Sequence, residues 1–147
     1  VGEWVLSLEK NQKRKLFNSI PQLPACFLKG GLLTENRFIY DPIDKKNLFL
    51  KTGALSVDME TWGIVEAADR YGAPVIAVRS ISDESEDKLP DMGYIFEGSG
   101  KLIKKKAFNY FIAIPSRFYP FIKLMFINLK KSSYSLNNFL HYLIQQI

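Results

Sequence analysis

Two apolar runs flank an amphipathic stretch in the middle of the chain. Residues 54–58 (ALSVD) and 74–82 (PVIAVRSIS) are short, apolar and rich in β-branched side chains, which is typical of buried strands. Residues 59–72 between them carry apolar side chains at helical spacing: Ile64, Val65, Ala68 and Tyr71. A strand, a helix and a strand within roughly 30 residues form a βαβ unit, so we expect the two strands to be parallel.

The pattern before this unit is less regular. Residues 6–21 (LSLEKNQKRKLFNSIP) predict a short solvent-facing helix that ends at Pro21. Residues 25–34 (ACFLKGGLLT) predict a strand interrupted by Gly30 and Gly31, where the backbone passes close to a neighbouring group.

A second helix is predicted immediately before the βαβ unit. Residues 35–40 form a loop or the end of a strand, and Asp41 and Pro42 then provide an N-cap and a proline at the first helical position. This helix is expected to run to Gly53, whose backbone freedom suits a helix end.

The last third of the chain changes to helical patterns. Residues 100–114, 116–131 and 136–147 predict helices or helical turns, separated by prolines and by serines at 132–135. No uninterrupted apolar run reaches the ~20 residues of a membrane-spanning helix, so none is predicted.

Composition narrows the class of protein. The 147 residues suit one domain, and 47% apolar with 24% charged residues is a globular composition. The single cysteine, Cys26, cannot form a disulfide framework, and the single histidine, His141, offers little for metal binding. We therefore expect a cytoplasmic protein without a structural metal.

Charge divides the chain into two parts. No Asp or Glu follows Glu97, whereas residues 98–147 hold eight basic residues: Lys101, Lys104, Lys105, Lys106, Arg117, Lys123, Lys130 and Lys131. The 20 basic and 15 acidic residues of the whole chain thus leave 12 basic and 15 acidic residues before position 98. We predict an α/β part over 1–97 and a basic, aromatic helical extension of the same domain over 98–147.

Acidic residues follow both strands of the predicted βαβ unit. Asp58 and Glu60 come at the end of the first strand, and Asp83 follows the second. Ligands of open parallel sheets bind beyond the carboxyl ends of the strands, so these acids are candidates for a ligand site. Alternatively, Asp58 and Glu60 favour the start of the following helix through its dipole, and Asp83 opens a surface loop.

Two motifs at this spacing resemble a known family. VDME at 57–60 and VRSISD at 78–83 are similar to the C-terminal signature of the nucleoside phosphorylase and nucleosidase superfamily. Residues 52–90 most resemble the hopanoid-associated phosphorylase branch, and the preceding Asp44, Lys45 and Lys46 fit that branch as well. The resemblance implies the C-terminal part of a three-layer α/β/α fold, with residues 98–147 as a helical extension.

The resemblance implies cleavage of a purine N-glycosidic bond. The leaving purine needs a proton, and general acid catalysis contributes typically 10²–10⁴-fold. The family's acid corresponds to Asp83, and Ser82 would orient its carboxyl group. To donate a proton, this carboxyl has to be held in its acid form by burial or by neighbouring acids. An Asp at this position matches the pattern for 6-amino purines, which implies adenine. The resemblance implies no organic cofactor.

The same resemblance assigns the sugar contacts. Glu60 would accept hydrogen bonds from the ribose 2′- and 3′-hydroxyls and stabilise the developing cation, Met59 would pack on the ribose, and Asp58 belongs to the substrate-binding group. Ordinary core filling remains an alternative for Met59.

The base contacts carry over from TENRFI at 34–39, although the interval from Phe38 to VDME is about one residue shorter than the family's. Phe38 would stack on the purine and the backbone of Ile39 would contact its edge, unless Phe38 is a buried strand residue. Arg79, on the second strand, would pair with a site acid, whereas Trp62 and Tyr71 are expected in the helix core.

The nucleophile is left open. In the superfamily an N-terminal half holds phosphate or water, and no counterpart precedes Val1. We therefore expect a part of a longer protein or a partial gene product, in which phosphate acts as co-substrate or water replaces it. Alternatives are a soluble methylthioadenosine- or futalosine-like nucleosidase and a non-catalytic nucleoside-binding module. By analogy with the family, a homo-oligomer is expected.

The basic aromatic segment has its own alternatives. Basic residues among bulky apolar ones suit a peripheral membrane contact, which would bring the enzyme to a lipid-linked (hopanoid-type) nucleoside. A helical cap with a solvated basic face explains the same pattern. Nucleic acid binding is disfavoured, because the aromatics lie among Ile and Leu at helical spacing.

Overall fold

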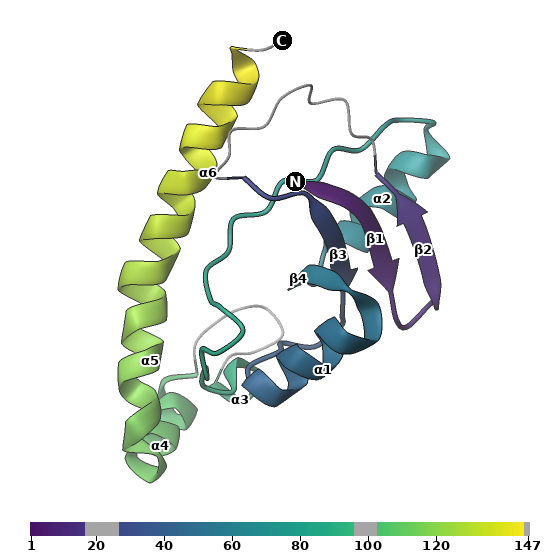
Figure 1. Ribbon diagram of the computed structural model, residues 1–147. Helices are drawn as coiled ribbons and strands as arrows, with labels where there is room; N and C mark the ends of the chain where they lie inside the picture. Colours follow the sequence, from purple (N-terminus) through teal and green to yellow (C-terminus); the bar gives the residue numbers. More distant parts are fainter. Residues whose placement is uncertain (17–26, 96–102, 146–147) are drawn as a thin grey trace. The chain divides into compact units, whose positions relative to one another are not determined.

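The computed structural model describes residues 1–16, 27–95 and 103–145, and it forms two compact units (Figure 1). The first, which we call the sheet unit, comprises Val1–Arg37 and Asn47–Arg79. The second, the helical unit, comprises Phe38–Lys46 and Ser80–Ile147. Each unit is described on its own.

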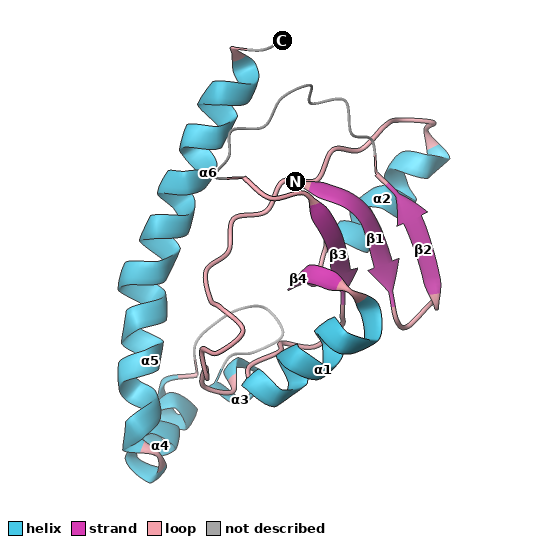
Figure 2. Cartoon of the chain, viewed as in Figure 1, coloured by secondary structure: helices cyan, strands magenta, loops and turns pink. Residues whose placement is uncertain are grey.

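A four-stranded mixed sheet forms the sheet unit, with the strand order β2-β1-β3-β4 (Figure 2). Its strands are β1 (Gly2–Ser7), β2 (Gln12–Lys15), β3 (Gly30–Thr34) and β4 (Ala54–Asp58). β1 pairs with β3 and β3 with β4 in parallel, while β2 is antiparallel to β1. Together with the C-terminal helices described below, this confirms the prediction of an α/β fold with a helical C-terminal segment.

The helix predicted for residues 6–21 is wrong over its described part. Residues 6–16 belong instead to the β1–β2 hairpin, whose turn contains Asn11 with a φ of 48°. β1 buries alternate residues, ending with Val5 and Ser7, and this period of two overrides the helix propensity of the lysines and glutamate nearby. Residues 17–21 lie outside the described residues.

The strand predicted for residues 25–34 is shorter, since β3 begins only at Gly30 and residues 25–26 are not described. The expected close approach at its glycines is confirmed. A Cβ at Gly31 would overlap the ring of Trp4, and one at Gly30 would overlap the side chain of Leu55. A side chain at either position would therefore displace Trp4 or Leu55 from its present place.

The two helices expected around β4 are confirmed. Helix α1 (Pro42–Thr52) begins where the Asp41 carboxylate accepts a 2.9 Å hydrogen bond from the Ile43 amide, and it ends at Gly53 with a φ of 68°. Helix α2 (Thr61–Arg70) follows β4 directly.

Helix α2 buries a different face from the one predicted. Trp62 and Val65 are buried, as expected, but Ile64 is exposed and Tyr71 is 87% exposed, so assigning those two to the core was wrong. α2 ends at Arg70, and Tyr71 follows it as the C-cap, beyond the packed face of the helix. The core cluster of this unit consists of Val5, Leu16, Leu32, Trp62, Val65 and Ala77.

The second strand of the predicted βαβ unit does not form. Residues 73–81 carry no strand, and they reach the sheet through one backbone bond, from the Gly2 amide to the Ala77 carbonyl at 2.8 Å. β1 is already paired with β3 on one edge and, over residues 4–7, with β2 on the other. Beside β1, residues 73–81 therefore bond only to Gly2, and Ile76 and Ile81 stay exposed.

The helical unit confirms the helical patterns of the last third. It contains α3 (Met92–Ile95), α4 (Lys104–Ala113), the 3₁₀ turn η1 (Pro115–Arg117), α5 (Phe118–Ile122), the π-helix η2 (Lys123–Asn128) and α6 (Leu129–Ile144). The break predicted at residues 132–135 is wrong. The Ser132 hydroxyl donates to the Leu129 carbonyl at 3.2 Å, so this serine bonds within α6 instead of ending it.

The predicted boundary between residues 97 and 98 lies outside the described residues. Among those that are described, no single helix has the length and apolar character needed to cross a membrane. The segments Lys104–Ala113 and Pro115–Ile144 satisfy those two requirements only as a pair, and they are bent by 115° at the break between them.

The core cluster generates a stability prediction. Leu32→Ala should lower the free energy of unfolding by about 2–5 kcal/mol, because the leucine is buried in the cluster on β3. Leu50→Ala, at a residue that is 70% exposed on α1, should change it by less than about 0.5 kcal/mol. Urea unfolding of both variants checks this, and equal losses would contradict the assigned core.

Candidate functional site

The end of β4 is organised around the carboxylate of Asp58. One oxygen, Oδ1, accepts hydrogen bonds from the Thr34 hydroxyl at 3.0 Å and from the backbone amides of Thr61 and Glu60 at 3.0 and 3.3 Å. Thr34 ends β3 and Thr61 begins α2, and the Thr34 hydroxyl also accepts from the Trp62 amide at 3.0 Å. The carboxylate therefore joins two strand ends to a helix start.

The second oxygen of Asp58 binds a cation. Oδ2 accepts a hydrogen bond from the Thr61 hydroxyl and a second one, of 2.7 Å, from Nε of Arg79. Nη2 of Arg79 in turn donates to the Thr61 hydroxyl at 2.5 Å. The ion pair expected between Arg79 and an acid of this region thus forms with Asp58, whose side chain is only 12% exposed.

Two opposing effects act on the proton affinity of Asp58. Burial alone would raise the pKa of its carboxyl group, but the hydrogen bonds from Thr61 and the charge and hydrogen bond of Arg79 outweigh it. The pKa of Asp58 therefore lies below its ordinary value of 3.8, and the residue is ionised at neutral pH. Because five hydrogen bonds from protein groups occupy this carboxylate, Asp58 positions the neighbouring residues that donate them.

Glu60 and Met59 lie exposed at the same strand end. Within the described part of the chain, the Glu60 carboxylate accepts a hydrogen bond from the Met59 amide at 3.3 Å, a contact within the turn before α2. Met59 is half exposed, so the alternative of ordinary core filling does not describe it. Unlike Asp58, these two side chains are open to a ligand.

Asp83 lies in the helical unit, where a lysine binds it. Nζ of Lys45 lies 2.7 Å from Oδ2 of Asp83 and also donates to the carbonyls of Glu84 and Asp87, at 2.8 and 3.0 Å. The Ser82 hydroxyl donates to Oδ1 at 2.9 Å, so the expected bond that orients the carboxyl group is present. The Lys45 side chain is 10% exposed and that of Asp83 23%.

The loop that follows Asp83 is closed on itself. The Asp87 carboxylate accepts from the Glu84 amide at 3.0 Å and lies 3.5 Å from Nζ of Lys123. The amide bond from Glu84 is the main reason that the pKa of Asp87 lies below its ordinary value. These bonds make the loop compact, and Lys45 binds it through the Asp83 carboxylate and through two backbone carbonyls.

The two residues predicted to contact the base lie in the helical unit. Ile39 is buried at 5% exposure, and Phe38 is half-buried in a segment without strand structure. The neighbouring Tyr40 carbonyl accepts from the Leu89 amide at 3.0 Å, which fixes this segment to the end of the acidic loop. Their roles in stacking on a base and contacting its edge stay predictions.

The structure thus forms two groups of candidate residues, one in each unit. Asp58 and Arg79 join Thr34 and Thr61 in the sheet unit, while Ser82 and Asp83 join Lys45 in the helical unit. Sequence reasoning missed Thr34, Thr61 and the Asp83 partner Lys45. In the sequence Lys45 appears only within the motif of residues 44–46, and no local pattern signals a bond to a residue 38 positions later.

No metal site accompanies these groups. In residues 1–16, 27–95 and 103–145, no cluster of three or more His, Cys, Asp or Glu side chains is arranged to hold a metal ion.

Comparisons with known proteins point to one family. The family model described as the phosphorylase superfamily matches residues 13–104. Purine nucleoside phosphorylases of the DeoD type from Caldanaerobacter subterraneus subsp. tengcongensis and Thermoanaerobacter pseudethanolicus are each 35% identical over 54 residues. Those residues are 37% of this chain and 23% of each relative, so the match spans about a quarter of the relatives' length. No solved structure matches the chain significantly.

The Asp58 network predicts a stability that depends on pH. Because the folded pKa of Asp58 lies below the unfolded value, its contribution is complete above about pH 4 and is lost as the pH falls through the folded pKa. Asp58→Asn should therefore cost about 1–3 kcal/mol of unfolding free energy at pH 7 and less near pH 2.

Urea unfolding at several pH values measures this difference. Asp69→Asn is the matched control, because Asp69 is half exposed and pairs with Arg14 on the surface, a pair worth about 0–1 kcal/mol. A pH-independent loss in Asp58→Asn would contradict the assigned charge network.

Lys45 generates a prediction about the acidic loop. Lys45→Met should increase amide hydrogen exchange over residues 83–88, because one buried ammonium group holds a carboxylate and two carbonyls of this loop. Lys46→Met, at the exposed neighbouring position, should leave the exchange unchanged. Mass-spectrometric exchange compares the two, and unchanged protection in Lys45→Met would remove Lys45 from its assigned role.

Proposed function

We propose, since the chain belongs to the phosphorylase superfamily, that it acts in the cleavage of the N-glycosidic bond of a purine nucleoside. The observation that carries this proposal is the family match over residues 13–104, which includes both acid motifs, VDME at 57–60 and SISD at 80–83. The names of the similar relatives, purine nucleoside phosphorylases, point to the same reaction.

In the proposed reaction Asp83 is the general acid. When the bond between C1′ of the ribose and N9 of the purine breaks, its electron pair stays on the base. A proton given by the Asp83 carboxyl group to N7 neutralises that charge, and a phosphate or water oxygen forms the new bond to C1′. The hydrogen bond from Ser82 fixes the rotation of the carboxyl group, which supports this role.

Glu60 is proposed to bind the ribose. Its carboxylate is exposed and has no cationic partner among the described residues; Oε2 accepts a 3.3 Å bond from the Met59 amide, and the carboxylate keeps acceptor positions for vicinal hydroxyls. A fixed negative charge near C1′ also stabilises the oxocarbenium character of the transition state. Met59, exposed beside it, offers a soft apolar surface for the sugar.

The finer assignment is adenine as the base, on a nucleoside whose 5′ position carries a lipid of the hopanoid type. The adenine preference follows from Asp83, since a carboxylate accepts a hydrogen bond from a 6-amino group. The lipid follows from the resemblance of residues 52–90 and of Asp44, Lys45 and Lys46 to the hopanoid-associated branch. Phosphate is proposed as co-substrate, with no other cofactor, and the active form as a homo-oligomer.

Lys45 favours a second candidate function. Nζ of Lys45 lies 2.7 Å from Oδ2 of Asp83, so one oxygen of the proposed acid is already bonded within the protein. The carboxylate can still accept a hydrogen bond from the adenine amino group. The second candidate is therefore a nucleoside-binding module that does not cleave its ligand.

Release of adenine from 5′-substituted adenosines, with and without phosphate, tests the proposed reaction. It is best measured on the longest natural version of this protein. Asp83→Asn should reduce the rate by 10²–10⁴-fold, because the variant cannot donate the proton. Glu86→Gln is the matched control, since it neutralises an exposed acid of the same loop and should retain activity.

The outcomes separate the alternatives. Release that requires phosphate identifies a phosphorylase, and release indifferent to phosphate identifies a nucleosidase. Full activity in Asp83→Asn would overturn the assigned acid. Saturable adenosine binding without release would replace the reaction by the binding module.

A further inference from the structure

The C-terminal part of the helical unit is both strongly basic and strongly apolar at its surface. No Asp or Glu follows Glu97, and the lysines of α4 and α6, at 104–106 and 130–131, are all exposed. None of these five lysines forms an ion pair with another described residue, whereas Lys123 of η2 pairs with Asp87. This surface therefore attracts a polyanionic partner.

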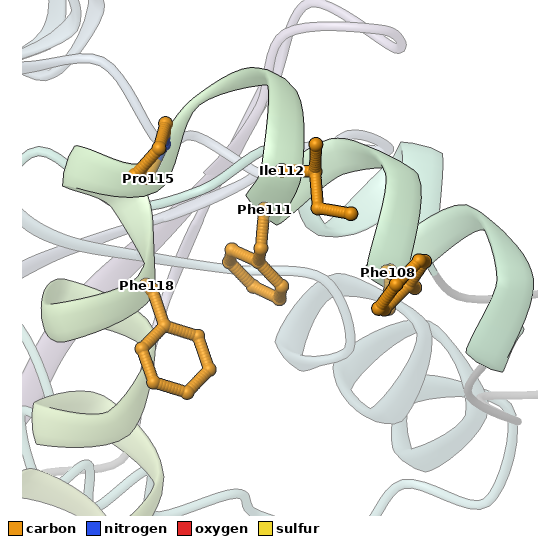
Figure 3. Close-up of a pocket in the computed structure, with 6 residues that line it drawn as sticks. Phe108, Phe111, Ile112, Pro115 and Phe118 are labelled. Atoms are coloured by element: carbon orange, nitrogen blue, oxygen red, sulfur yellow. The ribbon is translucent and has the colours of Figure 1, made fainter.

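Large apolar side chains share this surface. Phe108, Phe111, Ile112, Pro115 and Phe118 line an open groove of about 440 Å³ between α4, η1 and α5 (Figure 3). Three of them, Phe108, Ile112 and Phe118, are more than half exposed. Figure 3 shows the ring of Phe118 on the neighbouring helix, next to the α4 side chains.

The apolar surface continues beyond the groove. Along η2 and α6 five exposed apolar residues share one helical face, namely Met125, Phe126, Leu129, Leu140 and Ile144, and Ile127 and Tyr134 are exposed as well. Phe126 is 70% exposed. Such a surface is unfavourable in water, so something with an apolar interior is expected to cover it.

We propose that this surface, formed by α4, η1, α5, η2 and α6, docks the protein peripherally on an anionic lipid bilayer. Lysines complement the negative headgroups, and the exposed aromatic and aliphatic side chains enter the boundary between headgroups and acyl chains. This inference goes beyond the proposed reaction and does not depend on it.

Two other partners fit the surface less well. Nucleic acid offers phosphates and base faces, but Ile112, Leu129 and Ile144 are aliphatic and cannot stack on bases as aromatic rings do. A second copy of this chain would bring the same exposed lysines of α4 and α6 to the contact, where like charges repel. Of the three partners, only an anionic lipid surface offers both negative headgroups for the lysines and an apolar interior for the exposed apolar side chains.

Vesicle co-flotation of the full chain tests the docking. Vesicles of equal parts phosphatidylglycerol and phosphatidylcholine should bind the protein, and vesicles of phosphatidylcholine alone should bind it much more weakly. Binding should be released by high salt and by alkaline carbonate, because a peripheral contact leaves no segment across the bilayer.

Matched variants locate the contact. Neutralising Lys104, Lys105 and Lys130 to Gln should reduce partitioning on the order of 100-fold, since each lysine near an anionic surface contributes about fivefold. Neutralising Lys15, Lys46 and Lys51 to Gln changes the net charge equally and should have little effect, because these exposed lysines lie outside the surface. Phe126→Ser should reduce partitioning about tenfold and keep the salt dependence.

Several results would overturn the inference. These are equal binding to neutral and anionic vesicles, equal losses in the two triple variants, and resistance to carbonate, which would mean a segment inserted across the bilayer. Binding to single-stranded RNA without binding to vesicles would assign the surface to nucleic acid. A dimer in solution together with no vesicle binding would assign the apolar surface to a second copy of the chain.

Discussion

The Asp58 carboxylate joins the ends of β3 and β4, the start of α2 and Arg79 in a single hydrogen-bonded group. A buried charge of this kind is tolerable only when every acceptor position is satisfied, and here two hydroxyls, two amides and a guanidinium satisfy it. Removing one partner would leave an uncompensated charge beneath the turn of residues 59–60. The exposed position of Glu60 follows from that arrangement, because the network fixes the turn while leaving this second carboxylate outside it.

The two strand-end acids therefore differ in environment as well as in position. Asp58 is saturated by protein groups and holds the backbone, whereas Glu60 is open to a ligand. Asp83 lies between these extremes, since Ser82 and Lys45 bind it but its side chain keeps some exposure. If Asp83 donates a proton during the proposed reaction, its pairing with Lys45 has to weaken when the nucleoside binds. That requirement links Lys45 to the choice between turnover and simple binding.

Sequence alone predicted the elements whose signals are local. The N-cap at Asp41, the helix end at Gly53 and the strand that ends at Asp58 each depend on a few neighbouring residues, and all three are present. The failures have non-local causes. Residues 6–16 pair as a hairpin whose first strand lies beside β3, and residues 73–81 bond to the sheet backbone at Gly2 alone instead of adding a strand. Likewise, the motifs identified Asp58 and Asp83, but the bonds from Thr34 and Lys45 cross 24 and 38 positions of sequence.

The central claim is the proposal that Glu60 and Asp83 bind a purine nucleoside. Backbone amide chemical shifts followed by NMR during a titration with adenosine test it most directly, because they report binding whether or not turnover occurs. The account predicts saturable shifts at Glu60 and at Ser82 and Asp83, with weaker shifts for a pyrimidine nucleoside such as uridine. Absence of saturable shifts at these residues, or shifts confined to residues 103–145, would contradict it.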